Sequence, residues 1–395
     1  MGYRVSKSIN NYSIFNNFIV KEQRVYGSYL NLLNSNTKFN QQQVRLRCTL
    51  MAHESEYPIR SLSNLSHIKL HPWFITGLTD AEGCFTLKIG KRIQLEFVIG
   101  MHTVDKNLIN SLKEFFGIGN IWENKRNNTI YFKVSKIKDL ITIIIPHFEN
   151  YPLQSKKQSD FYLFKQAAII KYGDGSNKKK RLTDKEVEDI IRIRLSINRR
   201  KISENLQQKY PHLLNNPVFI PEIKRNIDYI KDYWIAGFTS GDGGFYINCN
   251  ENKPYYVTFS YIISQKSDDY ELLEHIKSYF NCGTLRNYTR NTTYKYVKNI
   301  EQLSIEEINQ LPFKESIISY YTVKDRNDIN TIIVPFFLTY NIIGIKNNNF
   351  NLWVKAIDIV NNNKHLTHEG WAQILEYKYN MNSYSLKKIT NNIIE

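Results

Sequence analysis

The feature that most constrains the fold of this chain is a long internal repeat. The segment at residues 73–85, "WFITGLTDAEGCF", returns at residues 233–245 as "YWIAGFTSGDGGF", an offset of 160. Later blocks keep the same order at offsets of 164 and 189, so the second copy contains 25 additional residues between Arg286 and Val323. A repeat of this length is well above solenoid periods and predicts two related folding units in one chain.

Each copy predicts the same order of elements. An apolar stretch that ends at glycine is typical of a helix, and the alternation of apolar and polar residues after it indicates a two-stranded hairpin. Helical spacing returns at residues 108–115 and 272–279, and two further strands and a helix complete each copy. The predicted fold class is therefore α+β, with each copy arranged as helix, two strands, helix, two strands and helix.

The repeat also sets the predicted domain boundaries. Residues 1–66 have no counterpart in the repeat and are polar and rich in Asn, so we expect an N-terminal leader that packs poorly. The first repeat is assigned to residues 67–207 and the second to residues 227–395. Between them, residues 208–226 contain clustered prolines and lack a hydrophobic period, which is typical of a linker.

The charge of the chain indicates a polyanionic partner. Lys and Arg number 53 against 37 Asp and Glu, which gives a net charge of +16 and favours nucleic acid over a membrane surface. The alternative is a general solubility charge. No apolar run approaches the roughly 20 residues of a membrane span, and the four cysteines form no C-x-x-C pair, so no zinc site or disulfide framework is predicted.

The two repeated helices each carry a face of small residues. Gly77 and Ala81 are four positions apart in the first, and Gly237 and Gly241 are four apart in the second. Residues with this spacing share a helix face, and small side chains let two backbones approach closely. The sequence therefore predicts that the two helices pack against each other.

A carboxylate directly follows each small face. Glu82 and Asp242 are placed at helix C-termini, where a negative charge opposes the helix dipole by roughly 0.3–1 kcal/mol. Packing of the two helices would bring both acids together, which predicts a cation between them. Oxygen-only ligands suit Mg²⁺. The alternative, that both acids are solvated helix ends with C-capping glycines, does not explain their recurrence in register.

The motifs "ITGLTDAEG" at residues 75–83 and "IAGFTSGDG" at residues 235–243 resemble the two signature helices of single-chain LAGLIDADG homing endonucleases of the organellar, intron-encoded type. The resemblance covers the chain from Pro72 to its C-terminus. It implies two pseudo-twofold-related αββαββα repeats, whose saddle-shaped antiparallel sheets lie in the DNA major groove over paired signature helices. It also implies that Glu82 and Asp242 are catalytic acids that bind Mg²⁺ or Mn²⁺, with Ala81 and Gly241 at the same metal site.

The resemblance implies roles for three further residues. Gln265 matches the glutamine of a Gln-Lys pair and would orient water, whereas the first copy has Met101, whose thioether cannot donate a hydrogen bond. Lys157 and Lys346 match basic residues near the metals and would stabilise phosphate or leaving-group charge; the alternative is that they are surface lysines.

Asp80 departs from the repeat, because the second copy has Ser240 at that position. An acid that the chemistry required in both halves would be present in both copies, and this one is not. We therefore expect Asp80 to be a helix-end or structural residue.

The polar faces of the two hairpins are expected to contact DNA. A two-stranded ribbon fits the major groove, where base edges can be read. For any single residue the alternative is a solvent-facing strand position. The candidate contacts are Thr86, Lys88, Arg92, Gln94, Tyr246, Asn248, Tyr256 and Thr258.

The predicted function is site-specific cleavage of both strands of DNA, which would promote intron mobility. Water is the expected nucleophile, the protein is expected to act as a monomer, and the diverged copies predict a non-palindromic target. The alternatives are an RNA-binding intron maturase on the same fold and a catalytically inactive DNA-binding protein. The family's association with organellar introns, together with heavy Asn, Ile, Lys and Tyr usage, favours a mitochondrial location, with the chloroplast as the alternative.

Overall fold

The computed structural model describes residues 69–173, 181–197, 204–214, 227–250, 253–289 and 317–390, and the isolated positions 218, 225, 307 and 310. Side chains are described as far as residue 381. The predicted leader, residues 1–66, lies outside the described residues. Short helices, α8 (Glu204–Lys209) and a 3₁₀ turn at Pro211–Leu213, overlap the start of the predicted linker.

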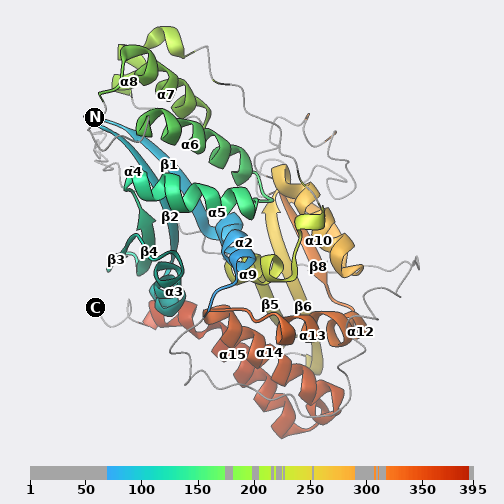
Figure 1. The fold of residues 1–395 in the computed structure, drawn as a ribbon. Coiled ribbons are helices and arrows are strands. Elements are labelled where there is room, and N and C mark those ends of the chain that lie inside the picture. Colours follow the sequence, from blue (N-terminus) through green and yellow to red (C-terminus); the bar gives the residue numbers. More distant parts are fainter. Residues whose placement is uncertain are drawn as a thin grey trace, which may run out of the picture. The chain divides into compact units, whose positions relative to one another are not determined.

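The first repeat contains the predicted elements in the predicted order (Figure 1). A helix and a hairpin are followed by a helix, two strands and a group of helices. The elements are α2 (Pro72–Glu82), β1 (Gly83–Ile89), β2 (Ile93–His102), α3 (Lys106–Phe116), β3 (Asn120–Asn124), β4 (Thr129–Val134), α4 (Ile137–Asp139), α5 (Ile145–Asn150), α6 (Lys157–Tyr172) and α7 (Asp184–Ser196).

The second repeat has the same order. Its elements are α9 (Asp232–Asp242), β5 (Gly243–Asn250), β6 (Lys253–Lys266), α10 (Tyr270–Phe280), β7 (Thr284–Thr289), β8 (Ile317–Val323), α12 (Arg326–Asp328), α13 (Val334–Thr339), α14 (Ile345–Asn361) and α15 (His368–Thr390). The additional residues of the second copy therefore fall between β7 and β8. Most of that segment lies outside the described residues.

Each repeat forms its own four-stranded antiparallel sheet. The strand orders are β1-β2-β4-β3 and β5-β6-β8-β7, which are equivalent under the repeat. Equivalent residues also pair within the first hairpin of each sheet, since Phe85 on β1 faces Phe97 on β2 and Phe245 on β5 faces Tyr261 on β6. The predicted α+β class with two related repeats is confirmed.

An aromatic cluster at the same place in each repeat holds helices against one face of the sheet. Phe85 on β1 lies at the centre of the first cluster and Phe245 on β5 at the centre of the second, with ring centroids 5.1–5.5 Å from their partners. Such pairs add about 0.5–1.5 kcal/mol beyond area burial. The partners are Phe97, Phe148, Phe161 and Phe164 in the first repeat and Tyr261, Phe337, Phe350 and Trp353 in the second.

The last helix of each repeat starts at a threonine cap. The Thr183 side chain accepts from the backbone N–H of Glu186 in a capping box at the start of α7, and Thr367 accepts from the N–H of Gly370 at the start of α15. These caps fix where the helices begin. Across the described part of the chain, the helices lack the combination of length and apolar character needed to cross a bilayer.

Candidate active site

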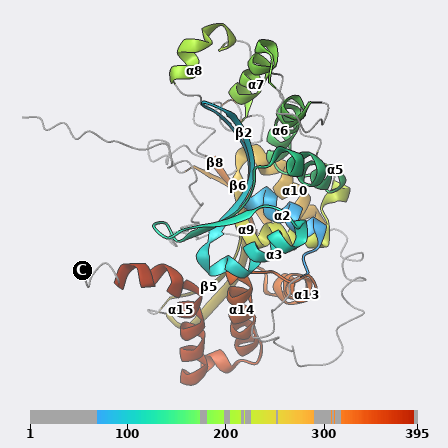
Figure 2. The same cartoon turned by 60° about the vertical axis from the view of Figure 1, so that its left-hand side comes forward.

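Helices α2 and α9 lie side by side at the junction of the two repeats (Figures 1 and 2). A Cβ atom added to Gly77 would lie 2.0 Å from the Trp234 carbonyl oxygen, and one added to Gly237 would lie 2.0 Å from the Phe74 carbonyl oxygen. Only glycine allows backbones this close. The packing predicted from the small faces is therefore present in the structure.

The same packing brings the two acids to neighbouring helix ends. α2 ends at Glu82 and α9 at Asp242, and the first strand of each sheet begins at the next residue. A Cβ added to Gly241 would lie 2.3 Å from the Ala81 Cβ and 3.0 Å from the Glu82 Cγ, so the helix ends touch. Asp242 is 2% exposed, and Glu82 is half-buried.

A lysine lies on the carbonyl end of each helix. Lys157 Nζ donates to the carbonyl oxygens of Thr79 (3.1 Å) and Ala81 (2.7 Å), and Lys346 Nζ donates to that of Gly241. The Thr79 carbonyl oxygen also accepts from the backbone N–H of Gly83 at the end of the helix. The ammonium groups offset the helix dipole, which the acids oppose.

The charge of Lys346 is coupled to both acids. Burial lowers the pKa of Lys346, and the nearby carboxylates of Asp242 and Glu82 act in the opposite direction. One ammonium group therefore interacts with a carboxylate from each repeat. Lys346 is therefore half-buried beside the two acids, and the alternative that it is a surface lysine does not fit this position.

The site is asymmetric at the position of the predicted water-orienting group. The Gln265 amide is buried on β6 and donates to Asp242 Oδ2, so it contacts one of the two acids directly. Its counterpart Met101 is buried in the apolar core of the first repeat. The two halves therefore differ chemically beside the carboxylates.

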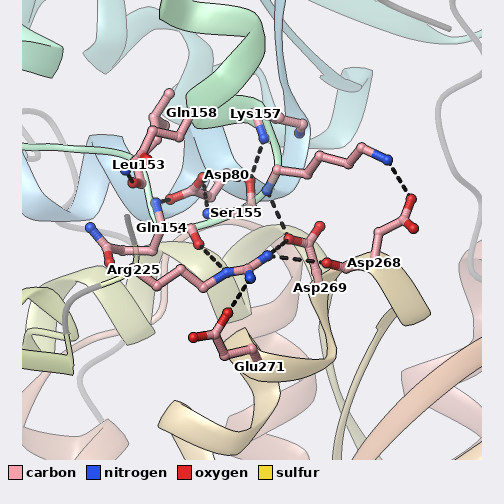
Figure 3. Close-up of polar contacts among 11 residues, drawn as sticks. Asp80, Leu153, Gln154, Ser155, Lys157, Gln158, Arg225, Asp268, Asp269 and Glu271 are labelled. Carbon is pink, nitrogen blue, oxygen red and sulfur yellow. Dashed lines mark hydrogen bonds and ion pairs between the residues drawn. The ribbon is translucent and has the colours of Figure 1, made fainter. Parts of the chain in front are cut away.

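The Asp80 carboxylate is buried and is engaged in hydrogen bonds, among them those to Gln154 and Ser155 (Figure 3). It accepts from the backbone N–H groups of Gln154 (2.9 Å) and Ser155 (3.0 Å), from Ser155 Oγ (2.6 Å), and from Trp234 Nε1 of the other repeat (2.8 Å). Burial raises its pKa, and these hydrogen bonds oppose the shift. In the second repeat Ser240 Oγ accepts from the N–H of Ile343.

The predicted DNA contacts lie on the two hairpins. Lys88 pairs with Gln94 across β1 and β2, and Asn248 pairs with Thr258 across β5 and β6, so each pair shares a face. Tyr246 is half-buried, and burial raises its pKa to about 12. Thr86 is also half-buried, whereas the exposed members are Lys88, Arg92, Gln94, Asn248, Tyr256 and Thr258.

Sequence reasoning missed an acid on this same face. Glu96 lies opposite Thr86 and bonds Lys88 Nζ (2.6 Å) and Lys133 Nζ (3.3 Å). Burial raises its pKa, but the two lysines outweigh that effect and the net shift is downward. The strand alternation already placed Glu96 on the polar face, and this was the available signal.

Two more missed acids connect the repeats. Asp105 accepts from the backbone N–H of Ile345, and Asp269 accepts from that of Lys156 and from Arg225. The signal was their recurrence at an offset of 164 residues.

The donor set at the helix ends fits a divalent ion of the magnesium type. Within the described ranges no three His, Cys, Asp or Glu side chains gather as a metal site. Mg²⁺ commonly uses only one or two carboxylates and completes its shell with water and phosphate oxygens. Glu82 and Asp242 provide two carboxylates at abutting helix ends, which meets that requirement.

Comparison with known proteins gives a consistent picture. A sequence model described as LAGLIDADG endonuclease matches residues 75–168 and 235–312. The chain is 32% identical over 406 residues to a Neurospora crassa protein named probable intron-encoded endonuclease 3, over 94% of this chain and 68% of that protein.

Solved structures that are similar include two DNA complexes. The LAGLIDADG homing endonuclease I-GzeII in complex with its DNA target is 31% identical with a TM-score of 0.67, over 80% of this chain and 99% of that one. I-SmaMI bound to uncleaved DNA in the presence of calcium ions is 30% identical with a TM-score of 0.67, over the same shares of the two chains.

Proposed function

The chain belongs to the LAGLIDADG endonuclease family, and we propose that it is a homing endonuclease that hydrolyses both strands of a double-stranded DNA site. The observation that carries this proposal is the meeting of Glu82 and Asp242, one from each repeat, at the abutting ends of α2 and α9. A protein that only bound DNA or intron RNA would have no use for two converging acids in a positively charged chain.

The chemistry assigned to the site follows from the groups present. Glu82 and Asp242 would hold Mg²⁺ or Mn²⁺, which when bound supplies a Lewis acid and lowers the pKa of water. Gln265 fixes the orientation of the Asp242 carboxylate through its amide hydrogen bond. Lys157 and Lys346 place positive charge where phosphate and leaving-group oxygens would develop negative charge.

Because both acids would hold the ion, water would be the nucleophile and no covalent intermediate with the chain would form. Ala81 and Gly241 contribute to the site through their carbonyl oxygens, each of which accepts from a lysine and retains a second lone pair.

The DNA is proposed to lie across the polar faces of the two hairpins. These faces carry exposed Lys88, Arg92 and Gln94 on one sheet and Asn248, Tyr256 and Thr258 on the other. Phosphate contacts from basic residues would position the duplex, and the amide and hydroxyl groups would read base edges. Because both half-sites are bound by one chain, the active form is a monomer on a non-palindromic site.

The biological setting is proposed from the relatives and the composition. The Neurospora relative is named as intron-encoded, and the heavy use of Asn, Ile, Lys and Tyr in this chain suits an AT-rich mitochondrial genome. Cleavage of an allele that lacks the intron would then promote its spread.

Incubation with two alleles tests the proposal. The purified protein is mixed with Mg²⁺ and duplex DNA from the host gene without its intron, and in parallel with the intron-containing allele. A double-strand break is expected only in the intron-less DNA, and EDTA should prevent it. Absence of cleavage in Mg²⁺ and in Mn²⁺, with specific binding to the intron RNA, would instead identify a maturase.

A further inference from the structure

Two buried aspartates reach across the junction between the repeats. Asp105 ends a 3₁₀ turn before α3, and Asp269 ends the equivalent turn before α10. Asp269 Oδ1 accepts from the backbone N–H of Lys156 in the first repeat at 2.7 Å, and Asp105 Oδ1 accepts from that of Ile345 in the second at 2.7 Å. The contacts obey the pseudo-twofold symmetry, because Lys156 and Ile345 are equivalent positions of the repeat.

Each bond is made one residue before a lysine of the candidate active site. Lys157 begins α6, and Lys346 is the second residue of α14. The aspartate therefore fixes the backbone from which the lysine side chain extends to the end of its own repeat's signature helix. The approach is close at Gly344, where φ is +88° and an added Cβ would lie 2.4 Å from Asp105 Oδ1.

A further residue, Arg225 from the predicted linker, reinforces only one of the two contacts (Figure 3). Its guanidinium bonds Asp269 Oδ1 (2.7 Å) and Glu271 Oε2 (2.6 Å), and it donates to the carbonyl oxygens of Gln154 (3.2 Å) and Asp268 (3.1 Å). The side chain is 7% exposed. A guanidinium with this many partners is held in one geometry.

The other contact lacks such a clamp. In the described part of the chain no arginine bonds Asp105, whose basic neighbours are Lys346 and His102. On the Lys157 side, Lys156 Nζ adds an ion pair to Asp268 at 2.5 Å. Among the described residues, Arg225 of the linker thus ties the start of α6 to the second repeat, and no equivalent group ties α14 to the first.

We propose that Asp269 and Arg225 are positioning residues for Lys157, and that Asp105 is the positioning residue for Lys346. Each active-site lysine is then placed by the opposite repeat, and the linker secures one of the two. This inference rests on the proposed function, since it takes both lysines to act in DNA cleavage.

The test is single-turnover nicking followed separately on each strand of the natural site. Lys157→Met and Lys346→Met first define how the two strands depend on each lysine. Asp269→Ala should reproduce the strand profile of Lys157→Met with a loss of about 10- to 100-fold, as expected for a misplaced group. Asp105→Ala is the matched variant, and should reproduce the profile of Lys346→Met.

Double variants separate positioning from general damage to the fold. Adding Asp269→Ala to Lys157→Met should cause no further loss of nicking rate. Adding Asp105→Ala to Lys157→Met should instead reduce the rate by the product of the two single-variant factors. Arg225→Met keeps the Asp269 bond to Lys156 and serves if Asp269→Ala does not fold; it should give a smaller loss with the Lys157 profile.

The outcomes distinguish this inference from the proposed function. If Lys157→Met and Lys346→Met both cleave like the wild type, the proposed role of the lysines fails. If those variants are impaired but Asp269→Ala or Arg225→Met has no effect, or multiplies with Lys157→Met, the positioning inference is overturned and the proposed function stands.

Discussion

At the scale of residues, a substitution in one repeat relative to the other is matched by a second substitution at the position that it contacts. The first repeat has Asp80 with Ser155, and the second has Ser240 with Gly344 at the equivalent positions. The Asp80 carboxylate uses the Ser155 hydroxyl and the Trp234 indole as donors, whereas Ser240 needs only a backbone N–H. Exchange of one member alone would leave a buried polar group without its partner, which typically costs 1–3 kcal/mol.

The buried side chain of His147 makes the folded state less stable at acidic pH. His147 on α5 is packed between the rings of Phe116 and Phe148, and its Nε2 makes no hydrogen bond within the described residues. Burial lowers its pKa from 6.5 to about 4. The unfolded chain takes up a proton below pH 6.5 and the folded one does not, so this group removes stability as pH falls from 6.5 to about 4.

His147→Phe should reduce the loss of folding stability at low pH, because phenylalanine does not titrate. The second repeat already accommodates a phenylalanine, Phe336, at the equivalent position. The full effect of the shift is about 3 kcal/mol at or below pH 4. Urea unfolding at pH 7.5 and pH 4.5 is the measurement: the variant should gain stability relative to wild type at the lower pH. An unchanged difference between the two proteins at both values would show that His147 does not titrate as its burial implies.

At the scale of elements, the α2–α9 contact depends on glycine. Gly237→Ala places a Cβ 2.0 Å from the Phe74 carbonyl oxygen, so the helices must separate, at a typical cost of 1–3 kcal/mol. Gly90→Ala is the control, because a Cβ there meets no atom within 4 Å. Thermal melting should show a clear drop for Gly237→Ala alone. Equal melting temperatures for both variants would mean that the helices do not meet as described.

Element order could be predicted from the sequence, and contacts between elements largely could not. The repeat fixed the equivalence of the two copies, and the glycine spacing predicted the helix pair. The bond between Asp269 and Lys156 joins residues 113 positions apart, and hydrophobic periodicity carries no information on such a pair. Hydrophobic periodicity also cannot predict the π-helical turns at Leu140–Ile144 and Ile329–Ile333, because a run of Ile has no period.

At the scale of the whole molecule, the divergence of the repeats predicts an asymmetric target. Gln265 and Met101 differ beside the acids, and the polar faces of the hairpins carry different side chains. Two symmetrised duplexes, each an inverted repeat of one half-site, should therefore be cut far more poorly than the natural site, since each wrong base pair costs about 1–3 kcal/mol. Strand-resolved nicking should also show unequal rates on the natural site. Efficient cleavage of either palindrome would mean that both sheets read the same sequence.

The central claim is that Glu82 and Asp242, one from each repeat, form a single DNA-cutting site. The direct measurement is cleavage and binding of the intron-less target by Glu82→Gln and Asp242→Asn, beside the wild type and Glu149→Gln, which removes an exposed acid elsewhere. Each active-site variant should lose double-strand cleavage in Mg²⁺ and retain specific binding, because charge is lost at the helix ends and not on the sheets. Glu149→Gln should cut normally. Wild-type cleavage by either active-site variant, or a loss of binding equal to the loss of cleavage, would contradict the account.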